Sequence, residues 1–79
     1  MTTLWLDSGP DGWRHKIGDE PVSCGTQIEV RLFGEWVSGR YEAEDLSPRA
    51  PRPAALLFYD NDKPPLRVEE FTEARFPRR

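Results

Sequence analysis

The chain has 79 residues, of which 37% are hydrophobic and 11% aromatic, and its 14 acidic and 11 basic side chains give a net charge of −3. A chain of this length forms one small domain that buries only about 60 to 65% of its extended-chain surface, which excludes a deep substrate cleft. The acidic sum argues against direct nucleic-acid binding, because affinity for phosphates depends on clustered Lys and Arg.

The charges are unevenly distributed along the chain. Residues 1–45 hold nine acids and four bases, whereas residues 46–79 hold five acids and seven bases. The single cysteine, Cys24, cannot form an internal disulfide, and the sequence contains neither a leader pattern nor an apolar run of about 18 residues. These features predict a cytoplasmic protein that does not enter a membrane.

Short strands are predicted from the first residues onward, because eight Pro and six Gly leave few windows for an amphipathic helix. Thr3 to Asp7 alternates, with Leu4 and Leu6 on one face. The turn-rich segment Ser8 to Gly12 follows, and then a second strand from Trp13 to Ile17. We expect these two strands to form a hairpin.

A second hairpin is predicted in Gln27 to Asp45, QIEVRLFGEWVSGRYEAED, around a two-residue turn at Gly34-Glu35. This turn sets a register in which Glu29 lies opposite Arg40 on one face and apolar side chains meet on the other. Gly39 within the second strand indicates a bend or bulge. The apolar pairs of this register are Leu32 with Val37, Val30 with Gly39, and Ile28 with Tyr41.

The remaining segments complete an all-β prediction. Residues 46–53, LSPRAPRP, predict an exposed loop, and the apolar run Ala54 to Asp60 predicts a central strand contacted on both faces. Leu66 to Glu70 predicts a short strand, and residues 71–79 a tail with one helical turn before Pro77. We expect one domain over residues 1–79: a small barrel of five or six antiparallel strands without a long helix, because closure hides strand edges.

Catalytic and metal-binding patterns are missing from the sequence. His15 is the only histidine, so neither it nor Cys24 can complete a zinc site, and a Cys–His nucleophile would need a third group to hold the base. Asp60-Asn61-Asp62 begins like a calcium loop but lacks the glycine and the distal glutamate. We expect a non-enzymatic protein that takes no cofactor, metal or small-molecule substrate.

Binding to another protein is the remaining prediction. Phe33 and Trp36 lie beside the predicted turn on the face opposite Ile28, Val30 and Leu32, and aromatic side chains of this kind are frequent binding hot spots. They are either exposed or capped by another segment. An acidic surface around them would select a basic protein partner; the predicted partner-binding residues are Phe33, Trp36, Glu29, Arg40, Glu42, Glu44 and Asp45. The alternative is nucleic-acid binding through Arg49, Arg52, Arg78 and Arg79.

The stretch VSCGTQIEVRLFGEWVSGRYEAED followed by AALLFY resembles small bacterial and phage-type proteins with an SH3-like barrel. The resemblance covers about residues 22–70 and implies an SH3-like fold. Such barrels generally dock peptides, proteins or nucleic acids, so it also implies a docking function.

In size and charge the chain also resembles phage-encoded inhibitors of host defence such as anti-CRISPR proteins. That resemblance implies an acidic inhibitor that competes for the Lys and Arg of a nucleic-acid-binding effector.

Overall fold

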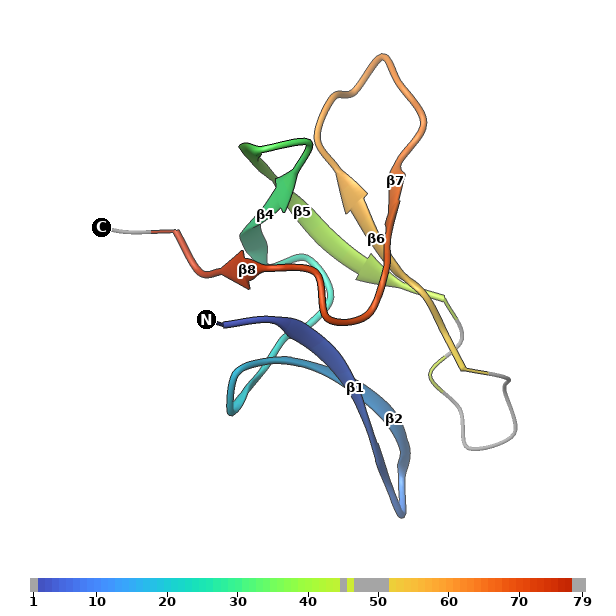
Figure 1. Cartoon of the computed structure of the whole chain (residues 1–79). Helices are drawn as coiled ribbons and strands as arrows, with labels where there is room; N and C mark the ends of the chain where they lie inside the picture. The colour runs from blue at the N-terminus through green and yellow to red at the C-terminus, as the bar shows by residue number, and fades with distance from the viewer. Residues whose placement is uncertain (1, 45, 47–51, 78–79) are drawn as a thin grey trace.

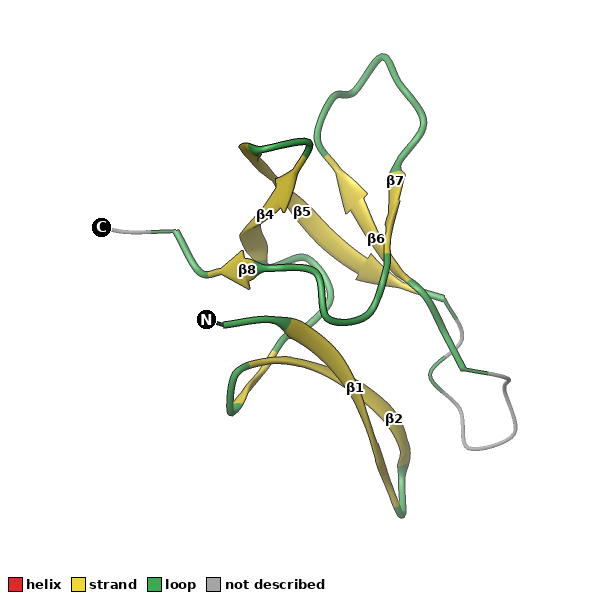
Figure 2. Cartoon of the chain, in the orientation of Figure 1, coloured by secondary structure: helices red, strands yellow, loops and turns green. Residues whose placement is uncertain are grey.

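The computed structural model describes residues 2–44, 46 and 52–77. These residues form eight β-strands joined by turns and loops, without a helix (Figures 1 and 2). No described segment is therefore a helix long and apolar enough to cross a membrane. The all-β prediction is confirmed. The strands are β1 (Leu4–Gly9), β2 (Gly12–Ile17), β3 (Glu20–Pro21), β4 (Gln27–Leu32), β5 (Glu35–Ala43), β6 (Ala55–Phe58), β7 (Leu66–Val68) and β8 (Ala74–Arg75).

The strands form two antiparallel sheets instead of one closed barrel. The smaller sheet has the order β1-β2-β3, and the larger has the order β7-β6-β5-β4-β8 (Figure 1). The segment before and within β8 joins them edge to edge. Thr72 accepts a backbone hydrogen bond from Leu4 of β1, and Glu73 accepts one from Arg31 of β4.

The first hairpin has the predicted strands and faces. Leu4 pairs with Ile17 and Leu6 with His15, so the apolar side of the hairpin turns towards the larger sheet. Trp5 lies on the other side, where its indole N–H donates to the Gly18 carbonyl at 2.7 Å. The alternation of the sequence predicted this hairpin correctly because one face of each strand is buried.

The second hairpin has the predicted strands but a different register. Leu32 pairs with Glu35 and Val30 with Val37, so the turn residues are Phe33 and Gly34 instead of Gly34 and Glu35. The register differs from the predicted one by two residues, which leaves every side chain on its predicted face. Ile28, Val30 and Leu32 therefore still face the core.

Gly39 serves a close approach and not a bulge. It pairs with Ile28 in an uninterrupted ladder. A Cβ at this position would lie 2.8 Å from Leu57 Cγ and 2.8 Å from the Phe58 carbonyl oxygen. Glycine here lets β6 pack its Leu57 side chain against β5.

The last third of the chain departs most from expectation. β6 lies inside its sheet, with Ala55 and Leu57 buried on one face and with Leu56 half-buried and Phe58 exposed on the other, so one face is covered more fully than the other. The helical turn predicted in residues 71–79 is wrong, because Ala74 and Arg75 form β8 and pair with β4. The predicted exposed loop lies largely outside the described residues; of its three described members, Leu46 is half-buried, Arg52 exposed and Pro53 buried.

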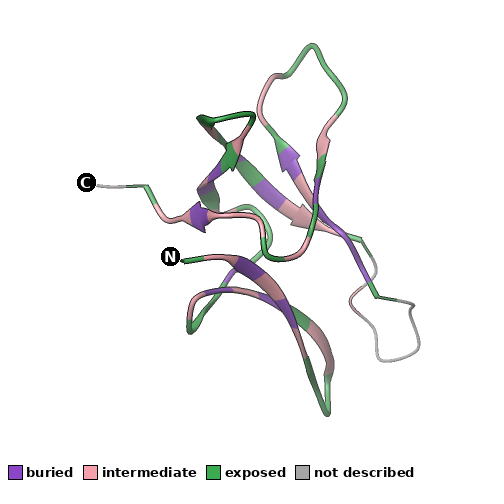
Figure 3. Ribbon diagram, viewed as in Figure 1, coloured by how far each residue is buried: buried purple, intermediate pink, exposed green. Residues whose placement is uncertain are grey.

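The core lies between the two sheets, where the buried positions of the strands face one another (Figure 3). Alternating burial along β1, β2, β4 and β5 places one side chain in two in this layer. The buried cluster consists of Leu4, Ile17, Val22, Ile28, Val30, Tyr41, Ala55, Leu57, Val68 and Ala74.

Candidate protein-docking site

The turn of the second hairpin presents a bare aromatic ring. Phe33 has a relative exposure of 102%, and its backbone φ of 53° lies in the left-handed region. Gly34 follows with φ of 80°, and positive φ at both central residues is the signature of a type I′ turn. Asn-Gly is the usual sequence for this turn, because a bulky side chain in the left-handed region is strained. Phe33 therefore adds strain to the fold and gains no burial in return.

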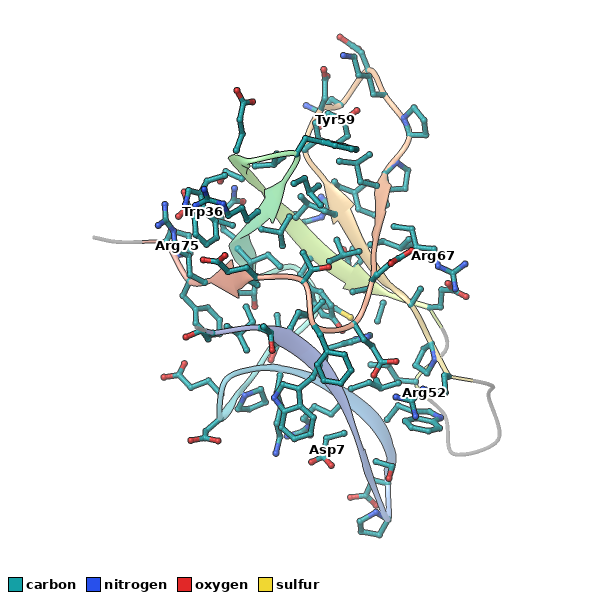
Figure 4. The ribbon with its side chains drawn as sticks, in the orientation of Figure 1. Asp7, Trp36, Arg52, Tyr59, Arg67 and Arg75 are labelled. Atoms are coloured by element: carbon teal, nitrogen blue, oxygen red, sulfur yellow. The ribbon has the colours of Figure 1, made fainter. Side chains whose placement is uncertain are left out.

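Trp36 lies two residues beyond this turn and is half-buried. It pairs directly with Arg31 across the hairpin, and the Arg31 guanidinium carbon lies 5.8 Å from the indole centroid. Arg75 of β8 covers the ring more closely, at 3.8 Å (Figure 4). Of the two aromatic residues that were expected to be either exposed or capped, Trp36 is partly capped by arginines and Phe33 is fully exposed.

Arg75 is held in place by a second contact. Its Nε donates to Glu29 Oε1 at 2.7 Å, and the two residues are direct partners in the β4–β8 ladder. Because Arg75 belongs to β8, the segment predicted as a loose tail supplies the cap of Trp36. The predicted cross-strand pair of Glu29 and Arg40 is wrong, since Glu29 lies opposite Ser38.

Two carboxylates of the predicted acidic surface are in ion pairs. Glu42 Oε2 forms an ion pair with Arg40 Nε at 3.2 Å, and Glu29 forms one with Arg75. Glu44 is exposed, and Asp45 lies outside the described residues. Arg40 also lies over the ring of Phe58, 5.0 Å from its centroid.

Of the four arginines of the nucleic-acid alternative, only Arg52 lies among the described residues. Arg52 forms a two-point ion pair with Glu70 and lies over Trp13, 5.3 Å from the ring centroid. Arg49, Arg78 and Arg79 lie outside the described residues.

A cleft of about 400 Å³ opens beside the Arg52–Glu70 pair. His15 lines its inner wall and is buried; its Nδ1 lies 2.6 Å from the Tyr41 hydroxyl. The imidazole also forms a hydrogen bond with the backbone of Pro53, which can only accept it through its carbonyl because proline has no N–H. Burial lowers the pKa of His15 and raises the pKa of Tyr41, and both shifts favour the neutral form.

The side chains of His15 and Tyr41 are both buried, and their rings meet edge to face. Cys24, by contrast, is exposed. Within the described ranges no cluster of three or more His, Cys, Asp or Glu residues could hold a metal ion. Every buried side-chain nitrogen or oxygen in the same ranges has a hydrogen-bond partner.

Sequence reasoning missed Arg31 and Arg75 as members of the site. Alternation along the strand could have placed Arg31 on the face of Trp36. Arg75 could not be placed there, because it reaches that face only through the pairing of β8 with β4.

Comparison with known proteins adds nothing to this geometry. The chain matches no protein-family model, and neither a curated protein nor a solved structure is significantly similar to it. The SH3-like and anti-CRISPR resemblances therefore stay predictions.

Proposed function

We propose that the protein is a non-enzymatic docking module that binds a protein partner through Phe33, with the arginine-stacked Trp36 beside it. The observation that carries this proposal is the fully exposed phenyl ring on a left-handed backbone. A strained backbone at an exposed aromatic disfavours the folded state, and such strain concentrates at functional sites. Aromatic side chains that enter a pocket on a partner account for most of the energy of many interfaces.

The second hairpin suits this role because it holds Phe33 on a rigid support. Six consecutive residue pairs join β4 to β5, and β8 and β6 flank them on either side. The ring is therefore presented without a large loss of conformational freedom on binding. A cytoplasmic location and an inhibitory effect on the partner belong to the same proposal, supported by the lone cysteine and by the small size of the chain.

A photo-crosslinking experiment tests the proposal. Phe33 is replaced by the photoreactive benzoylphenylalanine, the protein is irradiated in a lysate of the cells that encode it, and adducts are identified. The control carries the same group at Lys63, an exposed residue of the loop between β6 and β7. We expect one protein adduct from position 33 that is missing at position 63.

Competition makes the test specific for the phenyl ring. Unlabelled wild-type protein should remove the adduct, whereas the Phe33→Asn variant should compete roughly 30-fold less well, the equivalent of a hot-spot loss of about 2 kcal/mol. Equal competition by the variant would show that Phe33 contributes nothing to docking, and the proposal would fail.

A further inference from the structure

Four arginines share the outer side of the larger sheet, a surface called here the arginine face and defined by Arg31, Arg40, Arg67 and Arg75. Directly paired residues lie on the same side of a sheet, and side chains alternate along each strand. The ladders place Arg75 beside Glu29 and Arg31 beside Trp36. Further along they place Arg40 beside Phe58, and Glu42 and Arg67 on either side of Leu56. All four arginines therefore point away from the core.

The arginine face is positive although the chain is negative. Four arginines and three glutamates, Glu29, Glu42 and Glu73, give this side a net charge of +1, against −3 for the whole chain. Glu29 is paired with Arg75, and Glu42 with Arg40. Arg31 and Arg67 have no ion-pair partner among the described residues, and both are exposed.

The two arginines without an ion-pair partner lie at the two ends of this face. Arg31 lies next to the Phe33 turn, while Arg67 lies on the edge strand β7, and Figure 4 shows Arg67 at the opposite edge of the sheet from Trp36 and Arg75. Arg31 also stacks on Trp36, and Arg40 on Phe58. An aromatic support limits the rotamers of an arginine, so less side-chain entropy is lost when the guanidinium binds an anion.

Carboxylates on a protein fit this face better than a nucleic acid does. Trp36 is covered by Arg75 at 3.8 Å, so that face of the ring is closed to a base, and single-stranded nucleic acids depend on such stacking. Glu29 and Glu42 would repel a continuous row of phosphates. Separate carboxylates can instead bind Arg31 and Arg67 as two-point ion pairs.

We infer that the arginine face binds an acidic surface of the partner protein, with carboxylates seated on Arg31 and Arg67. This inference rests on the proposed docking function and names the chemistry of its partner. It replaces the basic partner expected from the sequence, because two carboxylates of the expected acidic surface are already in ion pairs. The partner then surrounds the pocket for Phe33 with Asp and Glu side chains.

The test uses a fluorescent glutamate oligomer as the probe and an oligothymidylate of matched length as its rival. Binding is measured by anisotropy at about 0.15 M salt, where charges act over only about 8 Å and distant residues contribute little. We expect the glutamate oligomer to bind more tightly, and the Arg side-chain N–H signals of Arg31 and Arg67 to shift in NMR spectra. The double variant Arg31→Glu with Arg67→Glu should weaken binding roughly tenfold.

A matched control separates the face from the net charge. Arg14→Glu with Lys63→Glu makes the same change in net charge at exposed residues outside the face, and it should alter affinity less than about twofold. Each double variant is first checked for an unchanged melting temperature. Arg40 and Arg75 are left intact because their ion pairs and ring contacts belong to the fold.

Three results would overturn the inference. The oligothymidylate could bind more tightly, the control could weaken binding as much as the test variant, or the glutamate oligomer could fail to bind. Phe33→Asn should leave binding of this probe unchanged, because the oligomer carries no pocket for a phenyl ring. Loss of crosslinking at position 33 and loss of oligomer binding are therefore separate outcomes for the two proposals.

Discussion

At the scale of single residues, Gly39 has the tightest steric constraint. Its neighbours leave no space for a methyl group, since a Cβ would meet Leu57 Cγ and the Phe58 carbonyl oxygen at 2.8 Å. We expect Gly39→Ala to lower the free energy of unfolding by about 1 to 3 kcal/mol, the usual cost of overpacking. Urea denaturation of the wild type and the variant measures this difference in the free energy of unfolding. Gly9→Ala is the control, because a Cβ there would lie an ordinary 3.8 Å from the Gly12 oxygen.

His15 gives the fold a dependence on pH. Burial is the main cause that lowers its pKa from the ordinary value of 6.5, with Pro53 and Glu70 opposing. Below pH 6.5 the unfolded chain binds a proton that the folded protein does not, so stability falls as the pH drops, by at most about 1.4 kcal/mol per pH unit, and levels off below the folded pKa.

This contribution is measured by urea titrations at a series of pH values from about 7.5 down to about 5, a range that brackets the titration of a free imidazole. We expect His15→Gln to reduce the acid-induced loss of stability, since glutamine does not titrate, even where the variant is less stable throughout. An unchanged pH dependence in His15→Gln would mean that other groups cause it.

At the scale of elements, the turn of the second hairpin separates stability from binding. Phe33→Asn should raise the free energy of unfolding by about 1 kcal/mol, because asparagine adopts the left-handed conformation with less strain. Phe33→Ala keeps the strain and removes only an exposed ring, so it should leave stability nearly unchanged. Denaturation curves of the two variants check this. A loss of stability in Phe33→Asn would show that the ring has a structural role.

The same hairpin shows how far the sequence could predict the elements. Strand positions and faces of β4 and β5 follow from alternation, which survives a two-residue error in register. The turn itself was mispredicted because glycine suits the first position of one hairpin turn and the second position of another, and Phe33 is a poor residue for the alternative. Local preference was overridden at the residue that we propose as the docking anchor.

The arginine face could not be predicted from local sequence patterns, for a different reason. Its members Arg31, Arg40, Arg67 and Arg75 are far apart in sequence and come from β4, β5, β7 and β8. Only the strand order brings them to one side. Clusters that are contiguous in sequence, such as the arginines of residues 46–53, are easier to recognise. Of these, Arg52 is described, and it is engaged in an ion pair with Glu70.

At the scale of the whole molecule, β8 and the residues before it unite the two sheets. Ala74 is buried, pairs with Val30 of β4, and donates a backbone hydrogen bond to the Thr2 carbonyl at 3.0 Å. The core is likewise shared, because Leu4 and Ile17 of the smaller sheet pack in one cluster with residues of the larger. Neither sheet covers its apolar face alone, so the two should be stable only together.

We therefore expect a single cooperative unfolding transition. In a thermal series followed by NMR, the amide signals of Leu6 in β1 and Leu57 in β6 should disappear at the same midpoint. Ala74→Ser places a hydroxyl in the shared core and should cost about 1 to 3 kcal/mol, which lowers the midpoint by about 4 to 8 °C per kcal/mol in a domain of this size. Both amides should shift equally, because β8 stabilises both sheets. If Leu6 kept its midpoint while that of Leu57 fell, the smaller sheet would be an independent unit, and the linking role of β8 would be refuted.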